Sequence, residues 1–229
     1  MTTKYQKLFN NEQNEGHFWP SFTDLLTTIL LCFMLIFICM MIIKSLEIED
    51  MKKTIDQIMG VRAQLVTELK EEFGDSDLGI EVDEKTGAII FNTEVLFEYN
   101  KAELKSDSFS FLDEFVPKYL EILLESGYEE YIAEIIIEGH TDRDGTYLYN
   151  LELAQDRAYS VASYILGDDF PYRHIQDHLE GKLTVNSKSY TDFRTGDDES
   201  YSAEESRRVE FKFRLKDEEI LQKTREILE

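Results

Sequence analysis

The chain is poor in cysteine, and both of its cysteines, Cys32 and Cys39, lie seven residues apart in one apolar run. In such a run, cysteines are interpreted as small apolar residues of a helix. The remainder of the chain has no cysteine, so it needs neither a disulfide framework nor a thiolate metal site in order to fold. Cysteine usage therefore does not decide between an oxidising and a reducing compartment.

Basic residues are also scarce, because 24 Lys and Arg stand against 47 Asp and Glu, for a formal net charge of -23. A nucleic-acid-binding protein needs clustered Lys and Arg to neutralise phosphates, so this balance argues against nucleic acid as a partner. It also argues against a polybasic protein of the membrane surface. After residue 43 the chain has 22 basic and 44 acidic side chains, so nearly all of the net negative charge follows the apolar run.

Charge is absent from Leu25 to Ile43, a stretch of 19 residues. As a helix, this stretch spans the roughly 30 Å of hydrocarbon in a bilayer. A signal peptide would need a basic n-region, a shorter apolar core and a small-residue cleavage site, and none is present. We therefore expect an uncleaved membrane anchor over residues 18–43, preceded by a tail over residues 1–17.

The orientation of this anchor does not follow from the charged residues beside it, because two Lys precede the helix and three follow it closely. A short tail is easily left in the cytoplasm while the folded part is exported. We therefore expect a single-pass protein of the inner membrane with a cytoplasmic N-terminus and a periplasmic C-terminal domain.

Asp24 lies about one turn inside the apolar segment, and Thr27 and Thr28 follow it on the same helix face. An ionisable group at such a depth is costly and indicates an ion or proton pathway. The alternative is a carboxylate at the cytoplasmic interface, stabilised by the helix N-terminus and by water. Likewise, the threonine hydroxyls either help to coordinate a cation or bond back to carbonyls of their own helix.

Residues 44–77 are expected to form a connecting helix or linker, since the stretch 45–73 is rich in helix formers and has no proline. Apolar residues recur with a helical spacing that Arg62 interrupts, namely Met51, Ile55, Ile58, Leu65 and Leu69. This pattern is compatible with a short parallel coiled coil between two copies. It is equally compatible with one amphipathic helix that lies on the domain or on the membrane.

The remaining chain is predicted to be an α+β domain over residues 78–216, followed by a helix over residues 217–229. Two alternating strands between Leu78 and Asn92 flank a turn, and a helix follows from about Ser106 to Ser126. A strand at 132–138, a helix at 150–166, a long loop and a strand at 208–215 complete the order. Helices on one face of a mixed sheet form an α+β sandwich.

Three histidines of this domain are weighed as metal ligands. His140 has no His or Cys near it in sequence and is interpreted as a packed residue at a strand end. His174 and His178 have an i, i+4 spacing that suits a metal, but no third ligand is identifiable, and a solvated loop or helix end explains them. We therefore predict no metal site and no cofactor.

The run IIIEGHTDRDGTYLYNLELAQDRAYSVASYIL, at residues 135–166, resembles the signature of OmpA-like peptidoglycan-binding domains. VLFEYNKAEL at 95–104 and SRRVEF at 206–211 are similar to the opening and closing segments of that family. The resemblance implies that Asp142 and Arg157 hold the two ends of a diaminopimelate-type stem peptide, with Asn150 and Arg208 in supporting positions. One carboxylate for an ammonium and one guanidinium for a carboxylate suit a zwitterionic head group.

The segment 141–145 also has the composition of a tight turn between a strand and a helix, in which Asp side chains accept hydrogen bonds from backbone N–H groups. For Asp144 and Gly145 we expect this turn role. The acidic stretch at 197–205 is expected to be a solvated loop.

A second resemblance concerns FWPSFTDLLTTILL, at residues 18–31, which is similar to the transmembrane motif of MotB-type stator subunits. In that family the Asp carries H⁺ or Na⁺, and two B subunits sit inside a ring of five MotA-like A subunits that turns when ions pass. The aromatic-Pro-Ser-aromatic-Thr-Asp spacing, neutral tail and short linker resemble the B subunit of the Zorya anti-phage system.

Two alternatives to that assignment stay open. One is a flagellar stator B subunit, and the other, of a different class, is a passive tether between membrane and wall that moves no ions. An enzyme is not expected, because no nucleophile with a base, phosphate-binding loop or metal cluster is apparent in the sequence.

Overall fold

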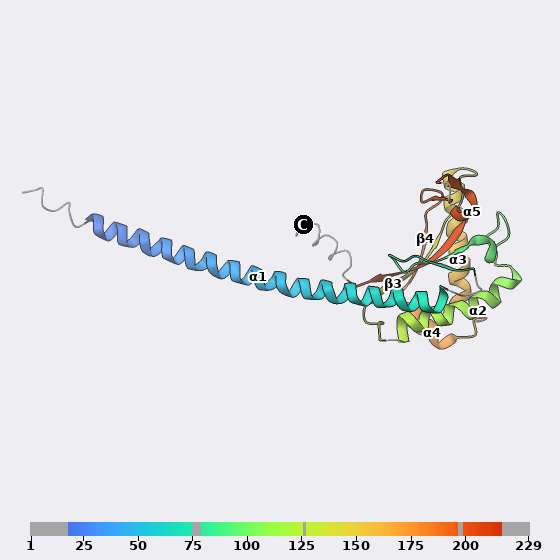
Figure 1. Ribbon diagram of the computed structural model, residues 1–229, viewed down its shortest axis with the longest axis horizontal. Coiled ribbons are helices and arrows are strands. Elements are labelled where there is room, and N and C mark those ends of the chain that lie inside the picture. The colour runs from blue at the N-terminus through green and yellow to red at the C-terminus, as the bar shows by residue number, and fades with distance from the viewer. Residues whose placement is uncertain (1–17, 75–78, 126, 197–198, 217–229) are drawn as a thin grey trace, which may run out of the picture. The chain divides into compact units, whose positions relative to one another are not determined.

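The computed structural model describes residues 18–74, 79–125, 127–196 and 199–216, without the side chains of residues 18–21, 125, 174 and 175. The expected tail over residues 1–17 and the expected helix over residues 217–229 lie outside the described residues. The chain divides into two units, residues 1–54 and 55–229. The first consists of the N-terminal part of α1, and the second contains the remaining elements (Figure 1).

One helix, α1 (Phe18–Phe73), includes both the apolar run and the expected connecting segment. No proline or positive-φ glycine interrupts it beyond its first turn, which is consistent with an unbroken helix. Its apolar stretch is long and hydrophobic enough to cross a membrane, with a mean hydropathy of 2.9 over 18 residues. The side chains of this stretch are exposed in the chain itself, as expected of a lipid-facing helix.

The C-terminal part of α1 belongs to the core of the second unit. Ile58, Leu65, Leu69 and Phe73 are buried there, whereas Met51 stays exposed. The sequence was compatible with a coiled coil between two copies or with an amphipathic helix on the domain. Residues 58–73 form the amphipathic helix on the domain. Arg62 interrupts the apolar spacing because its guanidinium donates to the carbonyl of Thr86 (3.1 Å) and stacks over a phenylalanine ring of the sheet.

The second unit is built on a five-stranded sheet in the order β1-β2-β7-β3-β4, which is mixed because only the last pair is parallel. The strands are β1 (Glu81–Val82), β2 (Ile89–Asn92), β3 (Ile132–Gly139), β4 (Leu183–Ser187) and β7 (Arg208–Leu215). Strands β2, β3 and β7 were predicted closely. The α+β fold class is confirmed.

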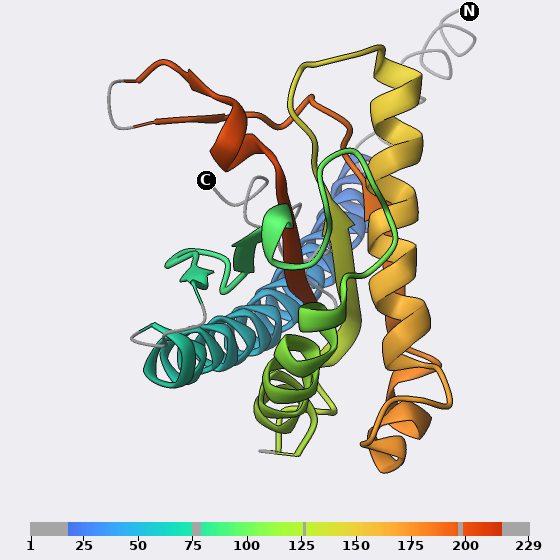
Figure 2. The same ribbon diagram turned by 90° about the vertical axis from the view of Figure 1, so that its right-hand side faces the viewer.

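Helices α2 (Ser106–Leu120) and α3 (Tyr147–Ile165) join α1 in covering one face of the sheet (Figure 2). A short 3₁₀ turn (Thr93–Val95) precedes α2, and a π-helical turn (Glu121–Glu125) follows it. Alternate side chains of β3 and β7, such as Ile135, Ile137, Phe211 and Phe213, fill the core between the two layers. Glu138 of β3 and Glu210 of β7 occupy the alternate positions. They lie directly opposite each other in the strand register, on the other face of the sheet.

The segment expected to be a long loop before the last strand contains further elements. These are α4 (Arg173–Leu179), β4, a small hairpin of β5 (Arg194–Thr195) and β6 (Tyr201–Ser202), and α5 (Ala203–Ser206). Strand β4 was missed because its five residues, LTVNS, have only two apolar side chains, and its identity depends on parallel pairing with β3.

Candidate functional site

The turn between β3 and α3 places the first predicted site residue. Asp142 lies just past the end of β3, and one oxygen of its carboxylate accepts a hydrogen bond from the backbone N–H of Asp144 (3.0 Å). Gly145 adopts φ +99, a backbone conformation that suits glycine. Thr146 then caps α3 by accepting from the N–H of Tyr149 (3.3 Å). Asp144 and Gly145 thus form part of the turn as expected, but the side chain that accepts the backbone hydrogen bond is that of Asp142 rather than Asp144.

The second oxygen of Asp142 pairs with Arg207, at 3.0 Å from Nη1. Arg207 also contacts Glu94 (3.3 Å). Burial alone would lower the pKa of the Arg207 guanidinium, but these two carboxylates outweigh burial and raise it. The carboxylates of Asp142 and Glu94 therefore favour the charged form of the Arg207 guanidinium.

Arg157 approaches the same place from the middle of α3 and is only 3% exposed. Its Nε donates to the carbonyl of Lys101 (2.9 Å), and its guanidinium lies 5.5 Å from the centre of the Phe97 ring. Burial lowers the pKa of this guanidinium, and the nearby charge of Asp142 opposes that change. Within the described residues, Nη1 and Nη2 have no hydrogen-bond partner, so most donors of a buried cation stay open to a ligand.

These side chains line a cavity of about 260 Å³ at one end of the domain. Of the predicted residues, Asp142, Asn150 and Arg157 meet here, and Asn150 donates from its amide to the carbonyl of Asp144 (2.8 Å). Tyr149 closes one wall by donating its hydroxyl to Asn100 (2.6 Å). The cavity thus offers carboxylates and guanidinium groups at short range, which is the chemistry that a zwitterionic ligand requires.

Arg208, also predicted for this site, does not line the cavity. It is buried on the polar face of the sheet, where it pairs with Asp192 (3.1 Å) and Glu210. The neighbouring Arg207 lines the cavity in place of Arg208. Sequence analysis missed Arg207 because consecutive residues of an extended chain point to opposite sides, and the pattern SRR does not reveal which arginine faces the cavity.

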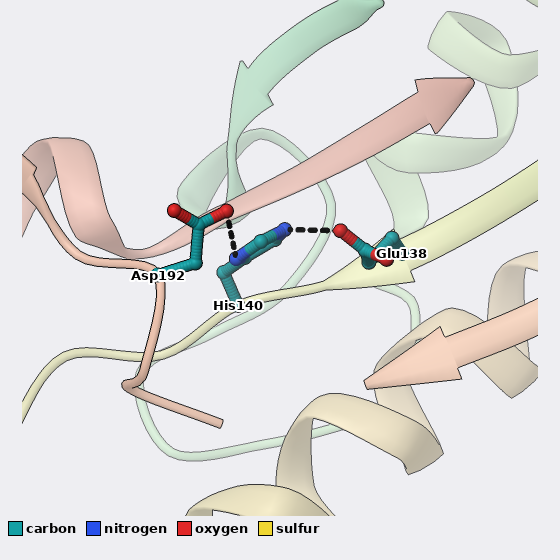
Figure 3. A group of neighbouring side chains, drawn as sticks. All are labelled: Glu138, His140 and Asp192. Atoms are coloured by element: carbon teal, nitrogen blue, oxygen red, sulfur yellow. Dashed lines mark hydrogen bonds and ion pairs between the residues drawn. The ribbon is translucent and has the colours of Figure 1, made fainter. Parts of the chain in front are cut away.

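His140 is fully buried between carboxylates (Figure 3). Its Nε2 lies 3.1 Å from Glu138, and its Nδ1 lies 3.9 Å from Asp192. The two carboxylates therefore approach opposite ring nitrogens, whereas the ligands of one metal ion converge on a common point. Glu138 is moreover bound by the ammonium of Lys212. We interpret the cluster as a network of ion pairs, in line with the prediction that His140 is a packed residue at a strand end.

The neighbours of Glu138 in this network change the pKa of its carboxyl group. Burial alone would raise the pKa of its carboxyl, but hydrogen bonds from His140 and Lys212 outweigh burial and lower that pKa to about 2. Of the other two histidines weighed as ligands, His178 lies 3.2 Å from Glu129 at the surface, and the side chain of His174 is outside the described residues.

In α1, the side chains of Asp24, Thr27 and Thr28 are at the surface of the apolar stretch. The hydroxyl of Thr28 donates to the backbone carbonyl of Asp24 (2.8 Å), and that of Thr27 lies 2.9 Å from the carbonyls of Thr23 and Asp24. The hydroxyl protons thus bond to carbonyls of their own helix, which is one of the two roles that the sequence left open for these threonines. Each hydroxyl oxygen keeps lone pairs that can accept from water or contact a cation.

Comparisons with known proteins agree with this organisation. The model of the OmpA family matches residues 96–205. Two proteins named Zorya protein ZorB are similar over most of the chain. The first, from Escherichia coli strain Crooks, is 32% identical over 70% of this chain and 72% of its own length. The second, from Escherichia coli O139:H28, is 28% identical over 90% of this chain and 85% of its own length.

Among solved structures, a putative MotB-like protein from Desulfovibrio vulgaris is 21% identical, with a TM-score of 0.47, over 72% of this chain and 99% of that chain. The family assignment depends instead on the sequence relatives, whose similarity extends through most of both chains. The chain belongs to the ZorB family of Zorya proteins and contains an OmpA-family domain.

Proposed function

We propose that this chain is the wall-anchored B subunit of an ion-driven membrane motor that acts in anti-phage defence. The observation that carries the proposal is the cavity in which buried Arg157 lies near Asp142. The Nη groups of Arg157 have no hydrogen-bond partner within the part of the chain that the structure describes. The arginine suits the carboxylate of a diaminopimelate-type stem peptide, and the aspartate suits its ammonium. Asn150 and Arg207 support this pair from the same cavity.

The anchoring role follows from combining this cavity with the apolar part of α1. A helix that spans the inner membrane with its N-terminus in the cytoplasm brings the domain into the periplasm, where peptidoglycan lies. A B subunit bound to the wall cannot rotate with its partner. By resemblance, two such chains sit inside a ring of five A-type subunits, and the ring turns around them.

The motor role depends on Asp24. Each elementary charge that crosses the bilayer yields about 2.3 kcal/mol per 100 mV. Protonation or cation binding at Asp24 lowers the cost of placing this side chain against an apolar partner, which couples ion passage to movement of the ring. Thr27 and Thr28 present hydroxyl oxygens on the same helix face, where they can order water or a cation, H⁺ or Na⁺, beside the carboxylate.

Wall binding is tested by sedimenting the full-length protein, in detergent, with purified peptidoglycan sacculi. Asp142→Asn and Arg157→Ala should each abolish most of the binding. Arg173→Ala is the matched control, because this arginine is exposed on α4 and contacts the side chain and the backbone carbonyl of Asp168 at the surface. Retention of both cavity variants on sacculi at the wild-type level would contradict the proposed site.

The motor is separated from a passive tether by Asp24→Asn, measured as protection of bacteria against phage. A motor loses protection while sacculus binding persists, whereas a tether is unaffected. Asp50→Asn is the control, because it removes a carboxylate from the same helix outside the uncharged stretch. The similarity to two ZorB proteins favours the Zorya assignment over a flagellar stator.

A further inference from the structure

Arg143 follows Asp142 in the turn between β3 and α3, but its side chain does not line the cavity. Its guanidinium instead stacks on two aromatic rings, 3.9 Å from the ring centre of Phe193 and 4.5 Å from that of Tyr201. Its backbone N–H also donates to the hydroxyl of Tyr201 (2.8 Å). A guanidinium is attracted to the face of an aromatic ring, so these contacts fasten the turn to the segment that contains both rings.

That segment is named here the hairpin arm and consists of residues 192–196 and 199–207, with β5, β6 and α5 (Figure 2). The backbone N–H of Arg194 in β5 donates to the hydroxyl of Ser206 in α5 (3.0 Å), and this hydroxyl donates to the carbonyl of Ser202 in β6 (2.5 Å). The backbone N–H of Arg207 is bonded in turn to a carbonyl of α5 (3.1 Å). Hydrogen bonds thus connect the arm internally from its strands to its last residue.

The last residue of the hairpin arm, Arg207, reaches the cavity and pairs there with Asp142 (3.0 Å). The arm therefore meets the turn twice, at neighbouring residues of the turn. Arg143 is held between rings of the arm, and Asp142 is paired with the end of the arm. The stacking of Arg143 fixes both the turn backbone that carries Asp142 and the arm that carries Arg207.

We propose that Arg143 is a positioning residue of the wall-binding cavity, which holds the hairpin arm so that Arg207 stays against Asp142. This inference rests on the proposed wall-binding function. A binding site requires neighbours that hold its ligand-contacting groups within a fraction of an ångström, and a site ordered in advance loses less entropy when the ligand binds. In this role Arg143 acts on the stem peptide through the arm and does not touch it.

The test measures binding of the tripeptide L-Ala–γ-D-Glu–meso-diaminopimelate by calorimetry, with the full-length protein in detergent. Arg143→Ala should weaken binding about threefold to tenfold, the effect of losing one or two cation–π contacts. Phe193→Ala should weaken it to a similar extent, although Phe193 does not line the cavity either. Phe193→Tyr retains the ring and should bind like wild type. Arg173→Ala, which removes a surface arginine of α4, is the control and should leave the affinity unchanged.

A double-mutant cycle tests the route through Arg207. Arg143→Ala added to Arg207→Ala should cause no further loss of affinity, because the side chain that Arg143 positions is already absent. Thermal unfolding of the same variants separates positioning from general destabilisation. The Tm of Arg143→Ala and of Phe193→Ala should stay within about 2 °C of wild type, since substitutions at the surface rarely exceed about 0.5 kcal/mol.

The outcomes distinguish the inference from the function on which it rests. Wild-type affinity in Arg143→Ala would overturn the positioning role while the cavity stands. So would a loss in Arg143→Ala that Phe193→Ala does not share, because it would mean that Arg143 contacts the peptide directly. An equal effect of Arg143→Ala with and without Arg207 would overturn the route through Arg207. Failure of the wild-type protein to bind the tripeptide would overturn the wall-binding function itself.

Discussion

The packing of the C-terminal part of α1 against the domain leads to a quantitative prediction at Leu69. This side chain is 0% exposed and belongs to the core cluster, together with Phe73 of the same helix and residues of α2 and the sheet. Leu→Ala changes at fully buried sites cost about 3 to 5 kcal/mol, because transfer free energy is lost and a cavity remains. We expect Leu69→Ala to lower the free energy of unfolding of the domain by about 3 kcal/mol.

In a cooperative unit of this size, 1 kcal/mol corresponds to about 2 to 4 °C in Tm, so the expected decrease is about 6 to 12 °C. The assay is thermal unfolding of the full-length protein in detergent, followed by near-ultraviolet circular dichroism. Met59→Ala is the control, since this side chain lies on the same helix and is 52% exposed. Its Tm should change by at most about 2 °C, because exposed substitutions rarely exceed about 0.5 kcal/mol.

The result that would refute this reasoning is a Tm of Leu69→Ala close to that of Met59→Ala. If these residues instead formed a coiled coil between two copies, Leu69→Ala would weaken association and leave the domain intact. The transition would then depend on protein concentration, whereas unfolding of a core within one chain does not.

Three further predictions concern the sheet and the cavity. Gly139→Ala should destabilise the domain by several kcal/mol in urea unfolding, because its Cβ would lie 2.2 Å from the carbonyl oxygen of Ala154; near-wild-type stability would contradict this packing. The depressed pKa of Glu138, about 2 against an ordinary 4.5, contributes stability above pH 4.5 that is lost as the pH falls toward 2, on the order of 3 kcal/mol. Glu138→Gln should therefore be less stable than wild type at pH 7 but lose less stability between pH 5 and pH 2, and parallel pH profiles would count against the network. Arg157→Lys should weaken tripeptide binding by at least about tenfold in calorimetry although the charge remains, because an ammonium cannot form the paired bonds of a guanidinium; unchanged affinity would exclude a paired contact.

Three residues of the site were predicted through the resemblance to OmpA-like domains, and local structure explains why they meet. Asp142 follows a strongly apolar strand, and Asn150 and Arg157 lie seven residues apart on the helix that begins after the turn. A spacing of seven returns to the same helix face, so both side chains reach the same cavity. Arg207 could not be chosen over Arg208 in this way, since the choice depends on the register of β7 against β3 and β2.

The sequence by itself determined the long apolar helix, the α+β class and the motif around Asp142, because each depends on residues that are close together in the chain. Only the tertiary structure decided that residues 58–73 of α1 complete the core, that the short β4 pairs with β3, and that Arg207 faces the cavity. These features depend on which surfaces meet after folding. An apolar stripe or a pair of arginines has the same local pattern whichever partner it finally contacts.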